Sequence, residues 1–365
     1  MALSKIPSAG FQDNVKFRNI IINGDMSIAQ RGTSSTGINS GLAYRTVDRF
    51  SSFASNGGTW TQTQSTDVPS GQGFSTSLKM DCTTANGSLS ADSRVDIRQS
   101  FEGQNLQYIK KGTSSAESLT LSFWVKSSKT GTYIAELFDL DNTRQISKSY
   151  TINSASTWEK KTLTFAGDTT GTFGNDNNAS LTLNLFLVAG SNISSGTLST
   201  TWTSNTNANR AVGQVNLADS TSNEWYVTGI QIEAGSQASD FEFLPVDVNL
   251  FRCQRYYFKT QDGVGTGNAI LMTGGVESST SAGQGSLTLP TEMRTTPTLS
   301  FGSGVRFYSY GSSTVTPTIA GNRSTSSNLS AVVTISGGTN GQAGYCYQGA
   351  TSGNIIGDAE LWLFQ

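Results

Sequence analysis

The sequence predicts an all-β protein made of two successive β-domains. Hydrophobic residues make up 35% and charged residues 14% of the 365 residues, and glycine is abundant, with 39 copies. Aromatic residues reach 10%, which separates this composition from that of a disordered chain. Short segments of alternating apolar and polar residues recur with turn residues between them. This pattern is typical of antiparallel sandwiches.

The larger domain is predicted to be a jelly-roll β-sandwich over residues 17–245, preceded by an extended polar arm at residues 1–16. The apolar run Ile20–Ile22 meets the turn dipeptide Asn23-Gly24, which predicts a first strand and a turn. A second short strand is expected over residues 26–28.

The clearest strands lie in the middle of this domain. Ser118–Lys126 places Leu119, Leu121, Phe123 and Val125 on one face, and only Trp124 breaks the polar pattern of the other. The second half of Ala179–Val188 is apolar on both faces, as expected for a central strand. Further strands are expected at Tyr44–Phe53, Thr59–Gln64, Ser77–Cys82, Arg94–Phe101, Thr132–Phe138, Thr157–Phe165 and Glu224–Glu233.

Two segments of the larger domain depart from the strand pattern. Gly103–Lys111 has the spacing of a helical turn. Ala189–Asn223 is rich in serine, threonine and asparagine without a sustained pattern, so we expect a surface excursion there.

The smaller domain is predicted to be a second β-sandwich over residues 246–365. A short helix is expected at Val248–Tyr257, followed by strands with Gly/Ser/Thr turns. The apolar segment Ile356–Phe364 is expected to be buried in a sheet or between subunits. Together with the cluster Tyr256-Tyr257-Phe258, it predicts a homotrimer. The expected strands are Ala269–Met272, Gly285–Leu289, Thr298–Tyr308, Val315–Ile319, Ser330–Ser336 and Ala343–Tyr347.

Several classes of function are disfavoured by what the sequence contains. It has no histidine, which removes Ser-His-Asp and Cys-His hydrolases and imidazole-ligated metals. With a net charge of −2, the chain lacks the excess of basic residues that is typical of nucleic-acid-binding proteins. No apolar run is long enough to insert into a membrane, and the first residues lack the apolar region of a secretory signal. The three cysteines are expected to be buried thiols.

A glycosidase would need two carboxylates about 5–9 Å apart. The acids Glu136, Asp139, Asp141 and Glu277 are scattered and show no paired signature. We therefore expect a protein that is not an enzyme and that uses no cofactor.

Several motifs resemble those of bacteriophage tail-fibre and virion structural proteins. RNIIINGDMSIAQRGTS (residues 18–34) and YRTVDRF (residues 44–50) resemble their opening. WYVTGIQIEAGSQASDFEF followed by CQRYY resembles the passage from a carbohydrate-binding-module-like jelly roll to a distal domain. The phrases LPTEMRTTPTLSF and GDAELWLF resemble that distal domain.

This resemblance implies a virion protein, foremost a tail fibre that attaches to host surface glycans by multivalent binding. The alternative is a capsid-decorating or tail-assembly protein that recognises no receptor. In both cases residues 1–16 are expected to bind other virion proteins. NGDMS resembles a turn that helps to form calcium sites through residues such as Asp25. Because the residue after Met26 is Ser27 rather than a glutamate, we expect no metal there.

Candidate sugar-stacking residues are Trp60, Trp202, Tyr308 and Tyr310, with a place in the core or in a subunit contact as the alternative for each. Trp124 is expected to pack between elements. Arg252, Arg255, Tyr256 and Tyr257 are expected at a domain or subunit junction, where the guanidinium forks of the two arginines lock the hinge. The alternative for the two arginines is contact with a receptor phosphate or carboxylate. The pair Asp48-Arg49 is expected to be structural.

Overall fold

A computed structural model describes residues 17–260, 270–276, 281–309, 316–335, 341–348 and 354–361. In this part of the chain the strands form four sheets, and the strand pairs are antiparallel, which confirms the all-β prediction. None of the helices found in these ranges is long and apolar enough to cross a membrane.

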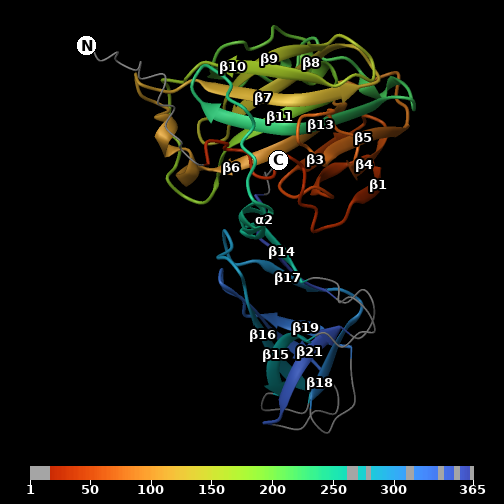
Figure 1. Ribbon diagram of the computed structural model, residues 1–365, viewed down its shortest axis with the longest axis vertical. Coiled ribbons are helices and arrows are strands. Elements are labelled where there is room, and N and C mark those ends of the chain that lie inside the picture. Colours follow the sequence, from red (N-terminus) through yellow and green to blue (C-terminus); the bar gives the residue numbers. More distant parts are fainter. Residues whose placement is uncertain are drawn as a thin grey trace, which may run out of the picture.

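Two sheets form a jelly-roll sandwich in the upper part of Figure 1. The first has six strands, in spatial order β1 (Ser34–Ile38), β4 (Thr59–Ser65), β5 (Ser77–Thr84), β13 (Glu224–Ala234), β7 (Leu119–Ser127) and β10 (Glu159–Phe165). The second has seven, in the order β12 (Thr203–Ser204), β9 (Arg144–Ile152), β8 (Gly131–Asp139), β11 (Ala179–Ala189), β6 (Arg94–Glu102), β3 (Ser51–Ser55) and β2 (Gly41–Tyr44).

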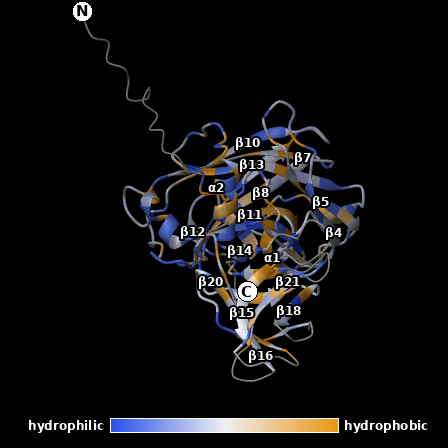
Figure 2. Cartoon of the chain, turned by 60° about the horizontal axis from the view of Figure 1, so that its bottom comes forward, coloured by the Kyte–Doolittle hydropathy of each residue, from blue (hydrophilic) through white to orange (hydrophobic). Residues whose placement is uncertain are grey.

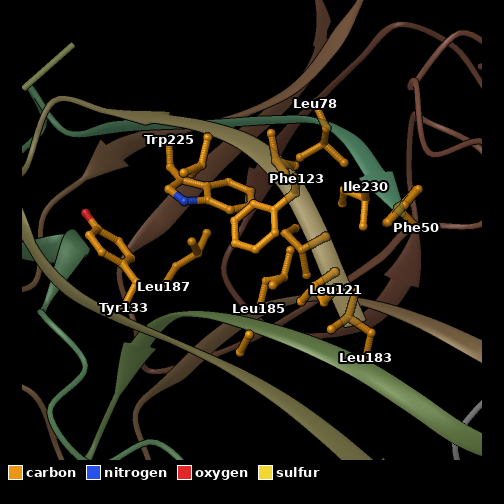
Figure 3. Close-up of a cluster of buried hydrophobic side chains, with 14 of the residues drawn as sticks. Phe50, Leu78, Leu121, Phe123, Tyr133, Leu183, Leu185, Leu187, Trp225 and Ile230 are labelled. Atoms are coloured by element: carbon orange, nitrogen blue, oxygen red, sulfur yellow. The ribbon is translucent and has the colours of Figure 1, made fainter. Parts of the chain in front are cut away.

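The main hydrophobic core fills the space between these two sheets. Phe123 of β7 and Trp225 of β13 meet Leu185 and Leu187 of β11 in Figure 3, and all four side chains are buried. The predicted alternation of β7 places its apolar face in this core, while Trp124 is half-buried on the opposite face. Figure 2 shows hydrophilic and hydrophobic residues interleaved along the strands. Such mixing is expected where one face of a sheet is covered.

The expected strands at Ile20–Ile22 and over residues 26–28 are wrong. Asn23 and Met26 adopt positive φ angles of 62° and 60°, which end the extended conformation. The side chain of Asn23 accepts from the Ile28 amide and donates to the Ile28 carbonyl, replacing ladder bonds. Gly24 is required because a Cβ there would lie 2.1 Å from the Ile230 carbonyl oxygen. The segment is an irregular strap whose Met26 is fully buried in the core.

The expected surface excursion at Ala189–Asn223 is instead partly packed against the sandwich. It contains α1 (Ser191–Ser194), β12, and the 3-10 turns η4 (Asn207–Asn209) and η5 (Leu217–Asp219). Ile193 and Ala211 are buried with Phe186 on the outer face of the seven-stranded sheet. The predicted helical turn at Gly103–Lys111 is present as η2 (Gly103–Asn105) and η3 (Gln107–Ile109).

The distal part begins with α2 (Val246–Gln254), which lies between the two bodies in Figure 1. The predicted helix reached Tyr257, but that residue already starts a strand. Three strands follow in the order β14 (Tyr257–Lys259), β22 (Ile355–Asp358) and β17 (Thr298–Phe301). Six more form a second sheet in the order β18 (Val305–Ser309), β21 (Ala343–Gln348), β15 (Ile270–Val276), β16 (Ala282–Thr288), β20 (Asn328–Thr334) and β19 (Thr318–Asn322).

A separate core supports the distal sheets, built around buried Met272, Phe307, Val333 and Cys346. The strands of the upper sandwich lie within residues 34–234 and the distal strands within residues 257–358. The domain boundary between residues 245 and 246 stays a prediction.

Candidate functional site

Trp60, the first predicted sugar-stacking residue, lies in the core. Strand β4 points its indole inward between the sheets, where it is 0% exposed, and its Nε1 donates to the Gly57 carbonyl at 2.8 Å. No face of the ring is open to a ligand. The structure therefore corrects the expectation that Trp60 contacts sugar.

The other predicted aromatic residues lie far apart in the fold. Trp202 is half-buried against the main core and donates from Nε1 to the Ala166 carbonyl at 2.7 Å. Tyr308 lies on β18, with its ring centroid 5.4 Å from that of Tyr345 on β21. Tyr310 lies outside the described residues. The fold does not unite Trp60, Trp202 and Tyr308 into one site.

The predicted junction residues lie between the upper sandwich and the distal sheets. Arg255, just after α2, donates from Nε and Nη2 to the two carboxylate oxygens of Glu102 on β6, at 2.9 and 2.7 Å. The Tyr256 hydroxyl donates to the same carboxylate. Burial by itself would raise the pKa of Glu102, but these donors lower it. The guanidinium fork expected at Arg255 joins the segment after α2 to the sandwich.

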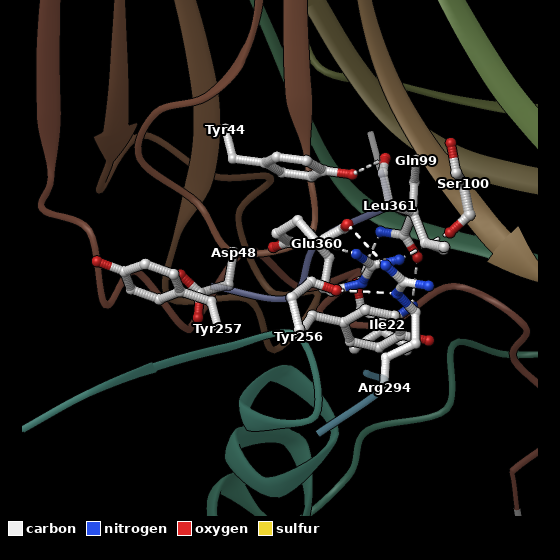
Figure 4. A network of polar contacts seen from close by, with 12 residues as sticks. Ile22, Tyr44, Asp48, Gln99, Ser100, Tyr256, Tyr257, Arg294, Glu360 and Leu361 are labelled. Atoms are coloured by element: carbon white, nitrogen blue, oxygen red, sulfur yellow. Dashed lines mark hydrogen bonds and ion pairs between the residues drawn. The ribbon is translucent and has the colours of Figure 1, made fainter. Parts of the chain in front are cut away.

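A second buried contact joins the segment after β22 to the sandwich (Figure 4). The carboxylate of Glu360 pairs with Arg49 and, at 3.3 Å, with Arg31. Arg49 also donates to the Ser100 carbonyl at 2.7 Å, and its guanidinium lies 3.4 Å from the ring centroid of Tyr256. Burial alone would lower the pKa of Arg49, but Glu360 raises it above its ordinary value.

Tyr257 and Arg252 complete the contacts of the junction. The Arg31 guanidinium lies 3.5 Å from the ring centroid of Tyr257, and Gln30 donates to the Tyr257 carbonyl at 2.8 Å. Arg252 donates to the Asn19 carbonyl at 3.3 Å. All four junction candidates therefore contact residues of the upper sandwich within one chain.

Asp48 and Arg49 are both buried but serve different partners. The Asp48 carboxylate accepts from the backbone amide of Gln30 at 2.9 Å and from its side chain at 2.5 Å. Burial raises the pKa of Asp48 to about 6, against the opposing effects of Gln30 and Arg31. The expected structural role fits this environment, although the two neighbours do not pair with each other.

Asp25 of the NGDMS turn is hydrogen-bonded to a residue of α2. Its carboxylate accepts from Asn249 at 3.1 Å and from the Ser27 hydroxyl at 3.1 Å. Within the described ranges, no group of three or more cysteine and acidic side chains is arranged to hold a metal ion.

A cleft of about 450 Å³ lies on the outer face of the seven-stranded sheet, away from the main core. Phe53 of β3 and Phe138 of β8 line it, and both residues are half-buried. The packed segment after β11 contributes Ile193 and Arg210. We call this the Phe53–Phe138 cleft. Its size is within the usual range for small-ligand sites.

A polar row crosses the floor of the Phe53–Phe138 cleft. Strand register places Arg98 of β6 opposite Asn184 of β11, and Asn184 opposite Glu136 of β8. Asn184 donates to Glu136 at 2.8 Å. Arg210 binds the same carboxylate from Nε and Nη2, at 2.8 and 2.7 Å. The Oδ1 atom of Asn184 is buried and has no partner in the described part of the chain.

A second ion cluster sits beside this row on β6. Arg94, Asp96 and Arg98 alternate along the strand and so share the outer face. Arg94 contacts Asp96 at 2.5 Å, and Arg98 binds the same carboxylate, with its Nη2 at 3.2 Å. The guanidinium groups of Arg98 and Arg94 lie 4.7 and 5.5 Å from the ring centroid of Phe53. The cleft therefore presents aromatic rings and guanidinium planes together.

Burial and the clustered charges shift the pKa values of this group. Burial by itself would raise the pKa of Asp96, but Arg94 and Arg98 lower it. Burial lowers the pKa of Arg94 to about 10 despite Asp96, and the like charges of Arg98 and Arg210 add to that effect. The carboxylate of Asp96 is thus held ionised between its two arginines.

The acids considered for catalysis have structural partners. Glu136 pairs with Arg210, Asp139 pairs with Lys111 at 2.6 Å, and Asp141 accepts from the Gly174 amide at 2.8 Å. Glu277 lies outside the described residues. Each of the three described acids is therefore engaged in an ion pair or hydrogen bond within the fold.

Sequence reasoning missed the Phe53–Phe138 cleft. Its walls come from β3, β6, β8, β11 and the loop that carries Arg210, which are far apart in the sequence. One signal was present: Arg94, Asp96 and Arg98 alternate with Val95 and Ile97. A strand with an apolar inner face and three charges on the other face marks a charged sheet surface.

No protein-family model and no curated protein matches the sequence. Among solved structures, the chain is similar to the enzymatically active domain of tailspike protein 4 of bacteriophage CBA120. The identity is 14% and the TM-score 0.31, with 60% of this chain and 21% of that one covered. The chain thus spans about a fifth of that tailspike chain.

Two carbohydrate-binding structures are also similar to this chain. TmCBM61 in complex with β-1,4-galactotriose shares 8% identity with a TM-score of 0.29, covering 60% of this chain and 99% of that one. The N-terminal cellulose-binding domain of Cellulomonas fimi β-1,4-glucanase C shares 13% identity with a TM-score of 0.29, covering 58% of this chain and all of that one. Similarities at this level carry no argument about function.

Proposed function

We propose that this protein binds glycans without catalysis, as a bacteriophage tail fibre that attaches to the host surface. The Phe53–Phe138 cleft is the observation that carries the proposal. Aromatic rings match the C–H faces of pyranose sugars, and buried polar groups fix the orientation of a ligand. Phe53 and Phe138 supply the rings, while Asn184, Arg98 and Arg210 supply the polar groups.

Two observations support the proposed virion role. They are the motifs of the sequence and the positions that the motif residues take in the fold. The segments RNIIINGDMSIAQR and YRTVDRF resemble phage virion proteins, and they supply Arg31, Asp48 and Arg49 to the junction. Buried ion pairs there hold the distal sheets against the glycan-binding sandwich. Residues 1–16 are proposed to attach the protein to other virion components.

Attachment would depend on several copies acting together. A single small sugar contact is weak, but linked sites gain avidity when their spacing matches that of the receptor. A homotrimer would present three Phe53–Phe138 clefts on one particle. The mechanism is therefore multivalent adhesion on the outside of the virion.

The second candidate is a capsid-decorating or tail-assembly protein that binds only virion proteins. A smaller cleft of about 270 Å³ favours it, because Phe17 and Tyr108 line this cleft and are 53% and 50% exposed. It lies where residues 1–16 join the described chain. Apolar exposure of this kind marks protein contacts.

Binding of the purified protein to glycan arrays and to host cells tests the first candidate. We expect Phe53→Ala and Phe138→Ala each to weaken binding about tenfold, the effect of losing one ring contact. Trp158→Ala is the matched control, because Trp158 is half-buried near Tyr226 of the other sheet. Glycan binding that is unaffected by both phenylalanine variants would contradict the assignment.

Removal of residues 1–16 separates the two candidates. For a tail fibre, the shortened protein still binds host cells but is absent from virions. If it fails to enter virions and the intact protein never binds cells or glycans, the decorating or assembly role replaces the proposed one.

A further inference from the structure

Three arginines line the Phe53–Phe138 cleft and share only two buried carboxylates. Arg94 and Arg98 bind Asp96, and Arg210 binds Glu136. The side chains of the arginines are 15%, 8% and 11% exposed, and both carboxylates are 0% exposed. Groups this buried are held in fixed positions, so their remaining hydrogen-bond capacity is pre-organised.

Several N–H groups of these arginines find no acceptor among the described residues. In the described part of the chain, neither Nη atom of Arg94 donates a hydrogen bond, and the same holds for Nη1 of Arg98 and Nη1 of Arg210. A planar guanidinium with unused N–H groups matches the geometry of a carboxylate or phosphate.

The buried part of the cleft carries a net positive charge. Its buried floor holds three guanidinium groups against two carboxylates. A further acid, Asp92, lies on the exposed rim, where it accepts from Asn56 and Ser90 at 2.7 Å each. The depressed pKa of Arg94 reflects a buried cation with insufficient compensation, which a bound anion would supply.

We propose that the Phe53–Phe138 cleft selects an acidic sugar, whose anionic group accepts hydrogen bonds from Arg94, Arg98 and Arg210. The pyranose ring lies against Phe53 or Phe138. This inference rests on the proposed glycan binding and adds the class of sugar. A carboxylate is shared by uronic and nonulosonic acids, and a phosphate or sulfate substituent presents the same acceptor chemistry.

Isothermal titration with paired oligosaccharides tests the proposal on the full chain. The pairs have the same backbone and differ only in whether one residue is a hexuronic acid or the corresponding neutral hexose. We expect the acidic member to bind about tenfold tighter, with affinity that falls as salt rises. Competition by free glucuronate but not by inorganic phosphate assigns the carboxylate source, and the reverse assigns a phosphate ester.

Two variants of one residue link the preference to the cleft. Arg94→Gln removes the charge and is expected to abolish the acidic preference. Arg94→Lys keeps the charge but loses the fork, so it should retain a reduced preference. Arg306→Gln on the distal β18 is the matched control and should behave as the unchanged protein. Thermal unfolding of each variant verifies that it is folded.

The possible results separate a failure of the acidic-sugar proposal from a failure of the proposed glycan binding. Equal binding of neutral and acidic members, unchanged in Arg94→Gln, overturns the acidic-sugar proposal while glycan binding stands. Acidic binding that persists in both Phe53→Ala and Arg94→Gln overturns the placement in this cleft. If neither member of any pair binds, the proposed glycan function itself fails.

Discussion

The guanidinium of Arg49 lies 3.4 Å from the ring centroid of Tyr256, although the two residues are far apart in the sequence. Both side chains are 1% exposed. Arg49 comes from the upper sandwich, and Tyr256 from the segment that leads into the distal sheets. The contact is completed by Glu360, which pairs with Arg49 from a third part of the chain. Three distant segments are therefore joined around one buried cation.

Glu360→Gln should strongly destabilise the protein, because it leaves Arg49 buried without its counter-ion. We expect the free energy of unfolding to fall by about 3–5 kcal/mol. Urea unfolding followed by tryptophan fluorescence measures the change. Glu292→Gln, at an exposed acid, is the control and should change stability little. A loss below 1 kcal/mol for Glu360→Gln would show that the pair contributes little.

Asp48 should make stability depend on pH between about 4 and 6. Its folded pKa of about 6 exceeds the model-compound value of 3.8, so the folded state binds the proton more tightly. The contribution of Asp48 to stability is therefore greatest below pH 4 and falls as pH rises to 6, by up to about 3 kcal/mol.

Asp48→Asn removes this titration, so the stability difference between the two proteins should vary over that pH range and level off above it. The measured quantity is how the stability difference changes with pH, not its absolute size. The absolute size is uninformative because the new amide side chain also alters the hydrogen bond to Gln30. Parallel pH profiles for the two proteins would contradict the assignment.

Gly24→Ala should destabilise the strap that crosses the sandwich. Its added Cβ would lie 2.1 Å from the Ile230 carbonyl oxygen, and backbone cannot yield as a flexible side chain can. We expect a loss of about 1–3 kcal/mol, measured by thermal or urea unfolding. Gly87→Ala serves as control, since a Cβ there meets nothing within 4 Å. Equal stability of the two variants would argue against the close approach.

Trp60→Ala tests the correction made for this residue. Loss of a fully buried indole should lower stability by about 3–5 kcal/mol. Glycan affinity of the remaining folded protein should stay unchanged, because Trp60 does not line the Phe53–Phe138 cleft. Titration at a temperature where the variant is folded gives the affinity. A selective loss of affinity without loss of stability would restore Trp60 as a ligand contact.

The homotrimer remains a prediction, based on the apolar segment Ile356–Phe364 and the cluster Tyr256-Tyr257-Phe258. The structure places Tyr256 and Tyr257 in contacts within one chain, where they are 1% and 5% exposed. A homotrimer would therefore need other surfaces for its subunit contacts. Sedimentation velocity or mass photometry of the purified protein gives the stoichiometry, and a monomer at micromolar concentration rejects the trimer.

The all-β class and the strongest strands could be predicted because local alternation determines which face of a strand is buried. The leucines of Ser118–Lys126 are an example, since their period of two needs no knowledge of partners. The short helix before Tyr257 was also visible, although its end was misplaced because Tyr257 pairs with Asp358 across a long sequence separation.

The Phe53–Phe138 cleft and the strap could not be predicted in the same way. Phe53 and Phe138 come together only through the strand order β3-β6-β11-β8, which no local pattern reports. The strap at residues 20–28 looked like a strand, yet the side chain of Asn23 replaces its ladder bonds. For Trp60 the sequence left both a sugar contact and a core position open, because an aromatic residue flanked by threonines has the same local pattern on either face of a sheet.

The separation of Arg49 from Glu360 has a consequence for synthesis on the ribosome. The two residues are 311 positions apart, so at ordinary elongation rates Arg49 emerges roughly 15–60 s before its partner. During that interval the nascent sandwich must either leave this arginine hydrated or remain incompletely closed. A truncated chain that ends before Glu360 lacks this counter-ion for Arg49 permanently. Only a chain synthesised through Glu360 can therefore pair the buried Arg49 at this junction.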